Sequence, residues 1–159
     1  MKTISFLGVL ILAATIAMAQ KSPIVAYGEP ITLEAAKKLA AESEKFAAEK
    51  QWTIIVAIVD IGGNLVLLQK MDNTQIGSID VAVAKAKTAN AFKRPTKSFE
   101  DVVAGGGSGL RILNVPGITP VEGGEPIYSN GKIIGAIGIS GMSSVQDGEV
   151  AKAALASFK

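Results

Sequence analysis

The chain has 159 residues, a length typical of one domain, and it is close to neutral, with 16 Lys and Arg against 14 Asp and Glu. It contains no His and no Cys, which excludes zinc fingers, Ser-His-Asp hydrolases and thiol nucleophiles. Hydrophobic residues make up 48% of the chain and aromatic residues only 5%, so we expect a folded domain with a core of Ile, Val, Leu and Ala.

An apolar N-terminal run predicts export. Lys2 precedes the run from Ile4 to Ala17, which ends in Ala17-Met18-Ala19 followed by Gln20. This pattern is typical of a secretory signal peptide cleaved after Ala19, and the run is shorter than the ~20 residues that span a bilayer. We therefore predict a signal peptide over residues 1–19, a periplasmic or secreted mature chain, and no stable membrane anchor after cleavage.

Charge and cysteine content limit the partners and the means of stabilisation. Apart from short pairs such as Lys93-Arg94, basic residues are not clustered, so the chain lacks the basic excess expected of a nucleic-acid-binding protein. Small exported domains often carry disulfides, and without Cys this core must be held by packing alone. We expect a small-molecule ligand and no nucleic acid.

The first half of the domain predicts a helix followed by a β-hairpin. Residues 20–31 contain Pro and Gly without periodicity and predict a mobile lead-in before a domain over residues 32–159. Thr32 to Lys50 has helical spacing of apolar residues, with Thr32 as N-cap. The continuous β-branched run Trp52 to Val59 and the segment Leu65 to Met71 flank a Gly-Gly turn, which predicts a hairpin.

The second half repeats this arrangement after two helices. We predict a helix over Ile76 to Phe92, a short helix over Ser98 to Ala104, and strands over Pro126 to Tyr128 and Lys132 to Ser140 around the turn Asn130-Gly131. A closing helix follows, with Ser144 and Asp147 at capping-box spacing. The order α-β-β-α-α-β-β-α predicts an α+β fold in which two hairpins form an antiparallel sheet with packed helices.

The glycine run Gly105 to Gly109 does not meet the tests for a phosphate-binding loop. No Gly-Lys-Ser/Thr follows it, and the third Gly of a dinucleotide fingerprint would fall at Leu110. We interpret the run as a flexible loop or tight turn.

A second glycine pattern, Gly135, Gly138 and Gly141, lies along a predicted strand. Glycine in a strand costs stability, so something approaches the backbone closely there. A flat ligand, the adjacent helix and a second subunit all satisfy this requirement.

Five carboxylates have apolar neighbours, and we predict no catalytic residue among them because no spacing brings two of them together. They are Asp60, Asp72, Asp80, Asp147 and Glu149.

Five ordered blocks resemble the GlcG/HbpS haem-binding family, and the resemblance extends from about Thr32 to Phe158. The blocks are Val56-Ala57-Ile58-Val59-Asp60-Ile61-Gly62-Gly63-Asn64-Leu65-Val66, Lys70-Met71-Asp72, Lys85-Ala86-Lys87-Thr88-Ala89, Gly124-Glu125-Pro126-Ile127, and Gly135-Ala136-Ile137-Gly138-Ile139-Ser140-Gly141 with Gln146-Asp147. The resemblance implies a profilin-like sheet, association into homo-oligomers, and binding of haem or a related tetrapyrrole. A related domain is fused to corrinoid adenosyltransferases.

The chain departs from the family pattern at the positions expected to bind iron. Family members often carry His in the first hairpin or on its second strand, where this chain has Asn64 and Gln69. Imidazole ligation is therefore excluded, and Met71, Met142, Tyr128 or a lysine remain as donors. Met71 is the family-matched iron ligand, although Met in an Ile-rich region often fills gaps in a core.

The leading hypothesis is an exported, non-catalytic protein that binds haem or a related tetrapyrrole. One alternative is a structural or interaction protein of the same fold that has lost haem binding, and a second is a haem-degrading or hydroxy-acid-related enzyme. The predicted ligand-binding residues are Met71, Asp72, Lys85, Pro126, Gly135, Gly138, Ser140 and Gly141.

Overall fold

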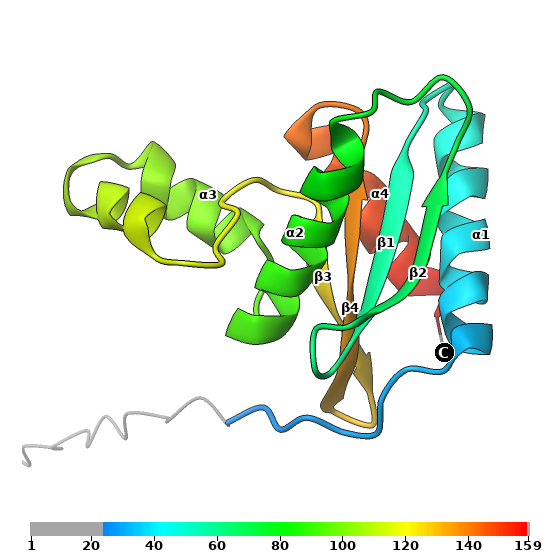
Figure 1. Ribbon diagram of the computed structural model, residues 1–159, viewed down its shortest axis with the longest axis horizontal. Helices are drawn as coiled ribbons and strands as arrows, with labels where there is room; N and C mark the ends of the chain where they lie inside the picture. The colour runs from blue at the N-terminus through cyan, green and yellow to red at the C-terminus, as the bar shows by residue number, and fades with distance from the viewer. Residues whose placement is uncertain (1–23, 159) are drawn as a thin grey trace, which may run out of the picture.

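The computed structural model describes residues 24–158, so the predicted signal peptide lies outside the described residues. The strands are β1 (Ile55–Asp60), β2 (Leu65–Lys70), β3 (Gly124–Ser129) and β4 (Lys132–Ser140). They form one antiparallel sheet in the order β2-β1-β4-β3, in which two hairpins lie side by side (Figure 1). The α+β prediction is confirmed.

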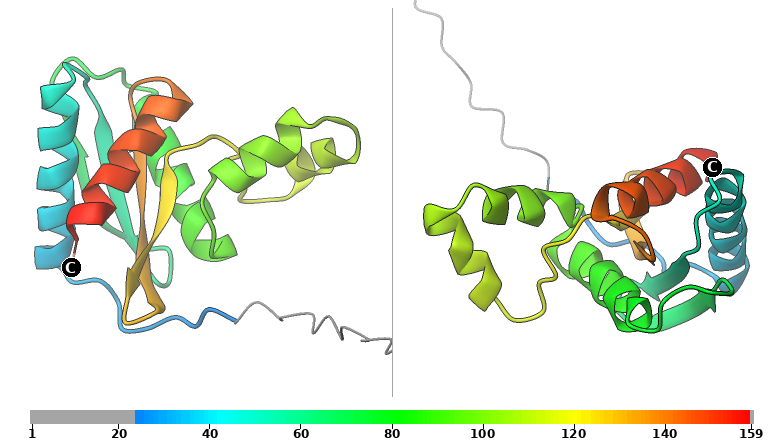
Figure 2. Two further views of the ribbon diagram at one scale, coloured as in Figure 1. Left: turned by 180° about the vertical axis from the view of Figure 1, so that it is seen from behind. Right: turned by 90° about the horizontal axis from the view of Figure 1, so that it is seen from above.

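Helices cover both faces of the sheet. They are α1 (Leu33–Glu49), α2 (Ser78–Phe92), α3 (Lys97–Ala104), the 3-10 helix η1 (Gly107–Asn114) and α4 (Ser144–Ser157). Helix α2 packs on one face, while α1 and α4 pack together on the other (Figure 2). No helix within residues 24–158 is long and apolar enough to cross a membrane.

Strand β1 is buried along almost its whole length because helices cover both of its faces. This explains its continuous apolar sequence, which does not alternate. The predicted strand started at Trp52, but β1 starts at Ile55, because the Trp52 N–H donates to the Ala47 carbonyl at the end of α1. The largest core cluster fills the space between the sheet and helices α1 and α4, with Leu39, Ile58 and Val150 among its buried members.

Helices α3 and η1 form an arm, residues 97–114, that projects away from the rest of the molecule (Figures 1 and 2). Of the two interpretations of Gly105 to Gly109, a flexible loop is wrong for the second half, because Gly107 to Gly109 begin η1, whose i to i+3 turns agree with a tight turn. A side chain at Gly109 would overlap the Val102 carbonyl of α3. Gly109 therefore lets the two helices of the arm lie close together.

The described part of the lead-in, residues 24–31, contacts the start of β4. The Ile133 N–H donates to the Ala26 carbonyl, and the Ile31 N–H donates to the Ile134 carbonyl. Tyr27 forms a parallel bridge with Ile133, beyond the point where β1 ends. The mobility predicted for residues 20–31 stays a prediction, and these hydrogen bonds argue against it from Ala26 onward.

The capping box of α4 lies one residue earlier than predicted. Ser143, not Ser144, is the N-cap, and it exchanges hydrogen bonds with Gln146. The prediction assigned Asp147 to the box, but the Asp147 carboxylate is turned inward and binds Lys85. A buried ion pair therefore replaces the predicted capping role.

Candidate functional site

The glycines of β4 allow close approach of other parts of the same chain. A side chain at Gly138 would overlap the Ala82 carbonyl of α2, so at this position the adjacent helix is what approaches the strand. Side chains at Gly135 and Gly141 would overlap the Val59 and Thr53 carbonyls. The pattern is thus explained within one chain, and ligand contact at these glycines stays a prediction.

Lys85 is enclosed between α2, β4 and α4, with only 1% of its surface exposed. Its ammonium group lies 2.7 Å from an Asp147 carboxylate oxygen and donates to the Ile139 carbonyl at 3.0 Å. The other Asp147 oxygen accepts the Met142 N–H. Both charges of this pair therefore have partners, which makes it a structural tie and leaves Lys85 closed to a ligand in this arrangement.

Two predicted iron donors lie at one end of the sheet. Lys70 and Ser140 both pair with Ile55, so Met71 and Met142 follow the strands on either side of β1 at the same end. Both side chains are half-buried and pack against the core on the α1 and α4 side.

Two aromatic rings pack against the same part of the core. Phe46 and Trp52 meet edge to face with their centroids 6.4 Å apart, and Trp52 is hydrogen-bonded to the end of α1. Both rings are half-buried. We call Phe46, Trp52, Met71 and Met142 the thioether end.

Only some of the other predicted ligand-binding residues adjoin the thioether end. Asp72 is exposed beside Met71, while Ser140 is buried at the end of β4. Pro126 is buried on β3 and pairs with Ala136, and Gly135 pairs with Asp60 at the opposite end of β1. Tyr128, a further predicted donor, lies beyond Pro126 on β3. The structure therefore places Asp72, Ser140 and Gly141 beside Met71 and Met142, and it places Pro126 and Gly135 elsewhere along the sheet.

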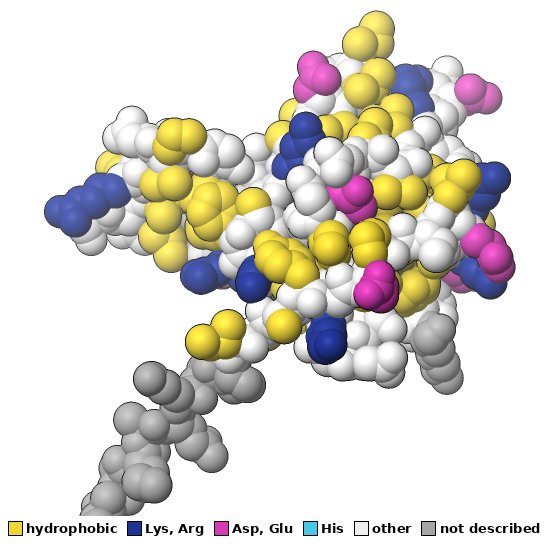
Figure 3. All heavy atoms as spheres, turned by 60° about the horizontal axis from the view of Figure 1, so that its bottom comes forward, with side chains coloured by type: hydrophobic (Ala, Val, Ile, Leu, Met, Phe, Trp, Pro, Cys, Tyr) yellow, Lys and Arg dark blue, Asp and Glu magenta, His cyan; other side chains and the backbone are white. Residues whose placement is uncertain are grey.

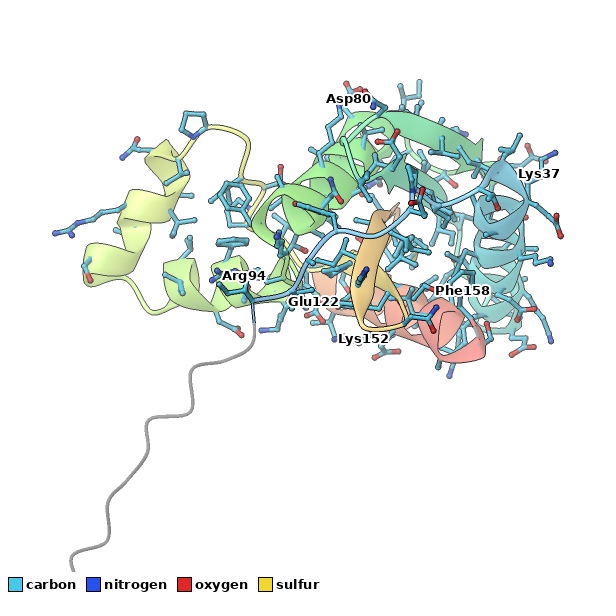
Figure 4. The ribbon with its side chains drawn as sticks, turned by 90° about the horizontal axis from the view of Figure 1, so that it is seen from below. Lys37, Asp80, Arg94, Glu122, Lys152 and Phe158 are labelled. Atoms are coloured by element: carbon cyan, nitrogen blue, oxygen red, sulfur yellow. The ribbon has the colours of Figure 1, made fainter. Side chains whose placement is uncertain are left out.

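A group of charged side chains that sequence reasoning missed lies where β3 meets α4. Glu122 and Glu125 are only 4% and 7% exposed, and the Lys152 ammonium lies 2.6 Å from a Glu122 oxygen (Figure 4). We call Glu122, Glu125 and Lys152 the Glu cluster. A side chain at Gly148 of α4 would overlap Glu122, so the helix backbone lies directly against this carboxylate.

The two carboxylates of the Glu cluster have different environments. Glu122 is paired with Lys152, whereas the Oε1 atom of Glu125 is buried without a hydrogen-bond partner. Burial raises the pKa of Glu125 to about 7; the charge of Lys152 opposes this shift and that of Glu122 adds to it. The signal in the sequence was a glutamate, Glu125, that follows two glycines and precedes buried strand residues. The lysine near it on α4, Lys152, is remote in the chain, so the sequence alone does not connect them.

The residues present fit a tetrapyrrole only in part. Two open grooves have volumes of about 410 and 370 Å³, the lower part of the range for ligand pockets. Neither is lined by Met71 or Met142. Among residues 24–158, no cluster of three or more His, Cys, Asp and Glu side chains could hold a metal ion. The thioether end thus offers thioether donors and half-buried aromatic side chains without an enclosing cavity among the described residues, which fits a partly exposed tetrapyrrole.

The sequence and fold match one family over most of the chain. A family model described as haem degrading protein HbpS-like matches residues 31–156. The chain belongs to the HbpS-like family. All five blocks on which the resemblance rests lie within this matched range.

One protein similar in sequence and two similar crystal structures illustrate the relatives of this HbpS-like chain. GlcG of Escherichia coli K12 is 35% identical over 110 residues, which cover 69% of this chain and 81% of GlcG. The crystal structure of Klebsiella pneumoniae protein ORFY has a TM-score of 0.76 and 36% identity, and the match covers 87% of this chain and 97% of ORFY. The crystal structure of a PduOC–haem complex has a TM-score of 0.72 and 30% identity, with 80% of this chain and 94% of that one covered.

Proposed function

We propose that this HbpS-like protein is exported and binds haem or a related tetrapyrrole without turning it over. The observation that carries the proposal is the similarity to PduOC, a chain crystallised with haem, which extends over 80% of the present chain. The family description, haem degrading protein HbpS-like, supports haem as the ligand, and its word "degrading" favours the enzyme alternative. The missing His argues against turnover, because the usual proton-transfer side chain is absent from the whole sequence.

The thioether end is the proposed binding site. The Met71 thioether would donate to iron, and the rings of Phe46 and Trp52 would contact the macrocycle. Haem, when bound, would supply an iron centre to which a thioether can coordinate. Met side chains are flexible, so Met71 can turn toward a ligand without a change in the β2 backbone.

The test is a titration of the mature protein with haemin, followed at the Soret band. We expect a saturable shift for the wild type and about tenfold weaker binding for Met71→Leu, about 1.4 kcal/mol of binding free energy. Met142→Leu is the comparison variant: this second thioether packs against the same core, and its loss should weaken binding less than the loss of Met71 does. Iron-free protoporphyrin should bind the wild type and Met71→Leu equally well.

Three outcomes contradict parts of this proposal. Absence of any Soret shift at micromolar protein rejects haem binding. A loss caused by Met142→Leu and not by Met71→Leu rejects Met71 as the donor. Loss of the Soret band with a reductant, accompanied by an open tetrapyrrole, rejects the non-catalytic assignment and favours the haem-degrading alternative.

The exposed apolar side chains of the arm support our proposal that the protein forms a homo-oligomer. They also favour the alternative that it is an interaction protein. The β4 glycine strand cannot form the subunit contact, because its positions are covered by other parts of the same chain. The arm instead exposes apolar side chains, visible as yellow groups in Figure 3. They include Val102, Leu110 and Leu113. An exposed apolar surface of this kind is typical of an interaction site.

Sedimentation velocity tests the homo-oligomer. We expect the wild type to sediment as an oligomer and Leu113→Ser, which changes a side chain that is 60% exposed, to dissociate it. A monomeric wild type would contradict the proposal. Export is tested separately by N-terminal sequencing of protein purified from its host, for which we expect Gln20 as the first residue.

A further inference from the structure

The Glu cluster joins three parts of the molecule that are separate in the chain. Glu125 lies on the edge strand β3, Lys152 on α4, and Glu122 in the segment that leads into β3. The Glu122 backbone N–H donates to the Glu100 carboxylate on α3, so the first part of the arm is bound to the same place. A change of charge in this cluster therefore acts on the strand, the helix and the arm together.

The cluster holds two carboxylates and only one ammonium group in direct contact. The Lys152 ammonium is 2.6 Å from Glu122, while the Glu125 Oε1 atom has no hydrogen-bond partner. Two ionised carboxylates at one buried site repel each other, and a single lysine cannot neutralise both. A proton on Glu125 removes this imbalance.

Charged groups on the other packed elements do not supply the missing positive charge. On the α2 side, the Lys85 ammonium is bound to Asp147. On α3, Lys97 is paired with Asp101 and acts on Glu122 only through space, while the Glu100 carboxylate adds a negative charge beside Glu122. The part of β4 that pairs with Glu125 is apolar, with Ile137 opposite. Lys152 is thus the only cation that directly contacts the carboxylates of the Glu cluster within the described chain.

We propose that Glu125 is a pH-dependent switch: when it is protonated, β3 is held against α4 and the base of the arm, and when it ionises, these contacts loosen. Ionisation places a charge on a buried side chain and adds repulsion from Glu122, and both effects drive the loosening. The Thr96 hydroxyl, which accepts the Gly124 N–H, lies at the base of the arm and is expected to share in the loosening.

The direction of the pH dependence follows from the proton balance of folding. The unfolded chain ionises Glu125 near its ordinary pKa of 4.5, whereas the folded chain keeps the proton up to a pKa of about 7. Between these values the folded state binds more protons, so stability falls as pH rises and then levels off above the folded pKa. One proton changes the folding equilibrium constant by up to about tenfold per pH unit, on the order of 100-fold over this interval.

Glu125→Gln and Glu149→Gln form the matched pair of variants for the test. Glutamine reproduces the shape of the protonated acid at Glu125, and Glu149 is an exposed carboxylate on α4. We expect thermal unfolding of the wild type and of Glu149→Gln to show this fall in stability across pH 5 to 8. Glu125→Gln should lack that component and should be more stable than the wild type at pH 8. An equal pH dependence in all three proteins would overturn the proposal.

Amide hydrogen exchange separates the switch from a general change in stability. At pH 8, residues 97–129 and 144–157 of the wild type should exchange faster than those of Glu125→Gln, while β1 and β2 should exchange alike. At pH 5 the two proteins should not differ. Because both are compared at the same pH, intrinsic exchange rates cancel. Equal exchange at pH 8, or a difference spread evenly over the whole chain, would contradict a local switch.

Discussion

Two buried groups of charges adjoin Gly123, one beside it in space and the other through its chain neighbour Glu122, and they differ in their balance of acids and bases. Lys85 and Asp147 form a one-to-one pair in which both side chains have further hydrogen bonds to the backbone. The Glu cluster has two acids for one base and leaves an oxygen atom of Glu125 without a partner. The first arrangement ties one geometry together, whereas the second is the one that we propose responds to protons.

The difference shows that burial alone does not indicate what a charged residue does. Lys85 is as enclosed as any residue of the core, and its role is to tie α2 to β4 and α4. Glu125 is slightly more exposed than Lys85, yet one of its oxygen atoms has no hydrogen-bond partner, and this makes it the group whose protonation can change with pH. The number of hydrogen-bond and charge partners therefore distinguishes the structural role of Lys85 from the proposed pH response of Glu125.

The largest expected effect comes from breaking the balanced pair. Lys85→Met leaves the Asp147 carboxylate buried without its cation, which should lower the free energy of unfolding by about 3–5 kcal/mol. Urea unfolding at pH 7 measures this change. Lys87→Met, an exposed lysine on the same helix, is the control and should have little effect.

A double variant protects the test against complete unfolding of Lys85→Met. Replacing both partners, as Lys85→Met with Asp147→Leu, removes the unpaired charge and should recover a large part of the lost stability. If the double variant is no more stable than Lys85→Met, the unpaired charge is not the cause of the loss.

A smaller effect is expected where the two groups come together. Gly123 has a φ of +121°, and a side chain there would lie 3.0 Å from the Lys85 ammonium and 2.8 Å from the Asp147 Cβ atom. Gly123→Ala should therefore cost about 1–3 kcal/mol of unfolding free energy through strain and crowding. Gly117→Ala is the matched control, because Gly117 also has positive φ but nothing lies within 4 Å. An equal cost at both positions would show that crowding contributes nothing.

The smallest effect is expected for an ion pair outside the buried region. Lys38 lies 2.9 Å from Glu34 on α1, and both side chains are largely exposed. Solvent screens such a pair, so Lys38→Met should leave the urea midpoint unchanged. A loss of stability comparable to that of Lys85→Met would contradict the inference that burial gives the Lys85–Asp147 pair its large contribution to stability.

The sequence predicted the elements because their signals are local. The apolar run of β1, the Asn130-Gly131 turn and the helical spacing of α1 each depend on neighbouring residues, and the structure has the strands and the helix there. The resemblance to the HbpS-like family is likewise confirmed by the family match. Helix η1 was missed because a glycine run usually indicates a loop.

The arrangement of the charged side chains could not be predicted in the same way. Glu122 and Lys152 are separated by 30 residues, and Lys85 and Asp147 by 62, so only the packing of α4 against the sheet brings them together. Local spacing predicts Asp147 in a capping box, but Ser143 and Gln146 form the box and Asp147 pairs with Lys85 instead. The convergence of Met71 and Met142 likewise depends on the pairing of β1 with both β2 and β4.

Carbon-13 NMR titration of the Glu125 carboxyl carbon in the intact protein tests the unequal balance most directly. Its resonance can be assigned by comparison with Glu125→Gln. Our account predicts a titration midpoint near pH 7, well above the ordinary value of 4.5, because this carboxyl is buried beside Glu122 and has an oxygen without a partner. A midpoint near 4.5 would contradict it, since Glu125 would then be ionised throughout the neutral range and could not respond to protons there.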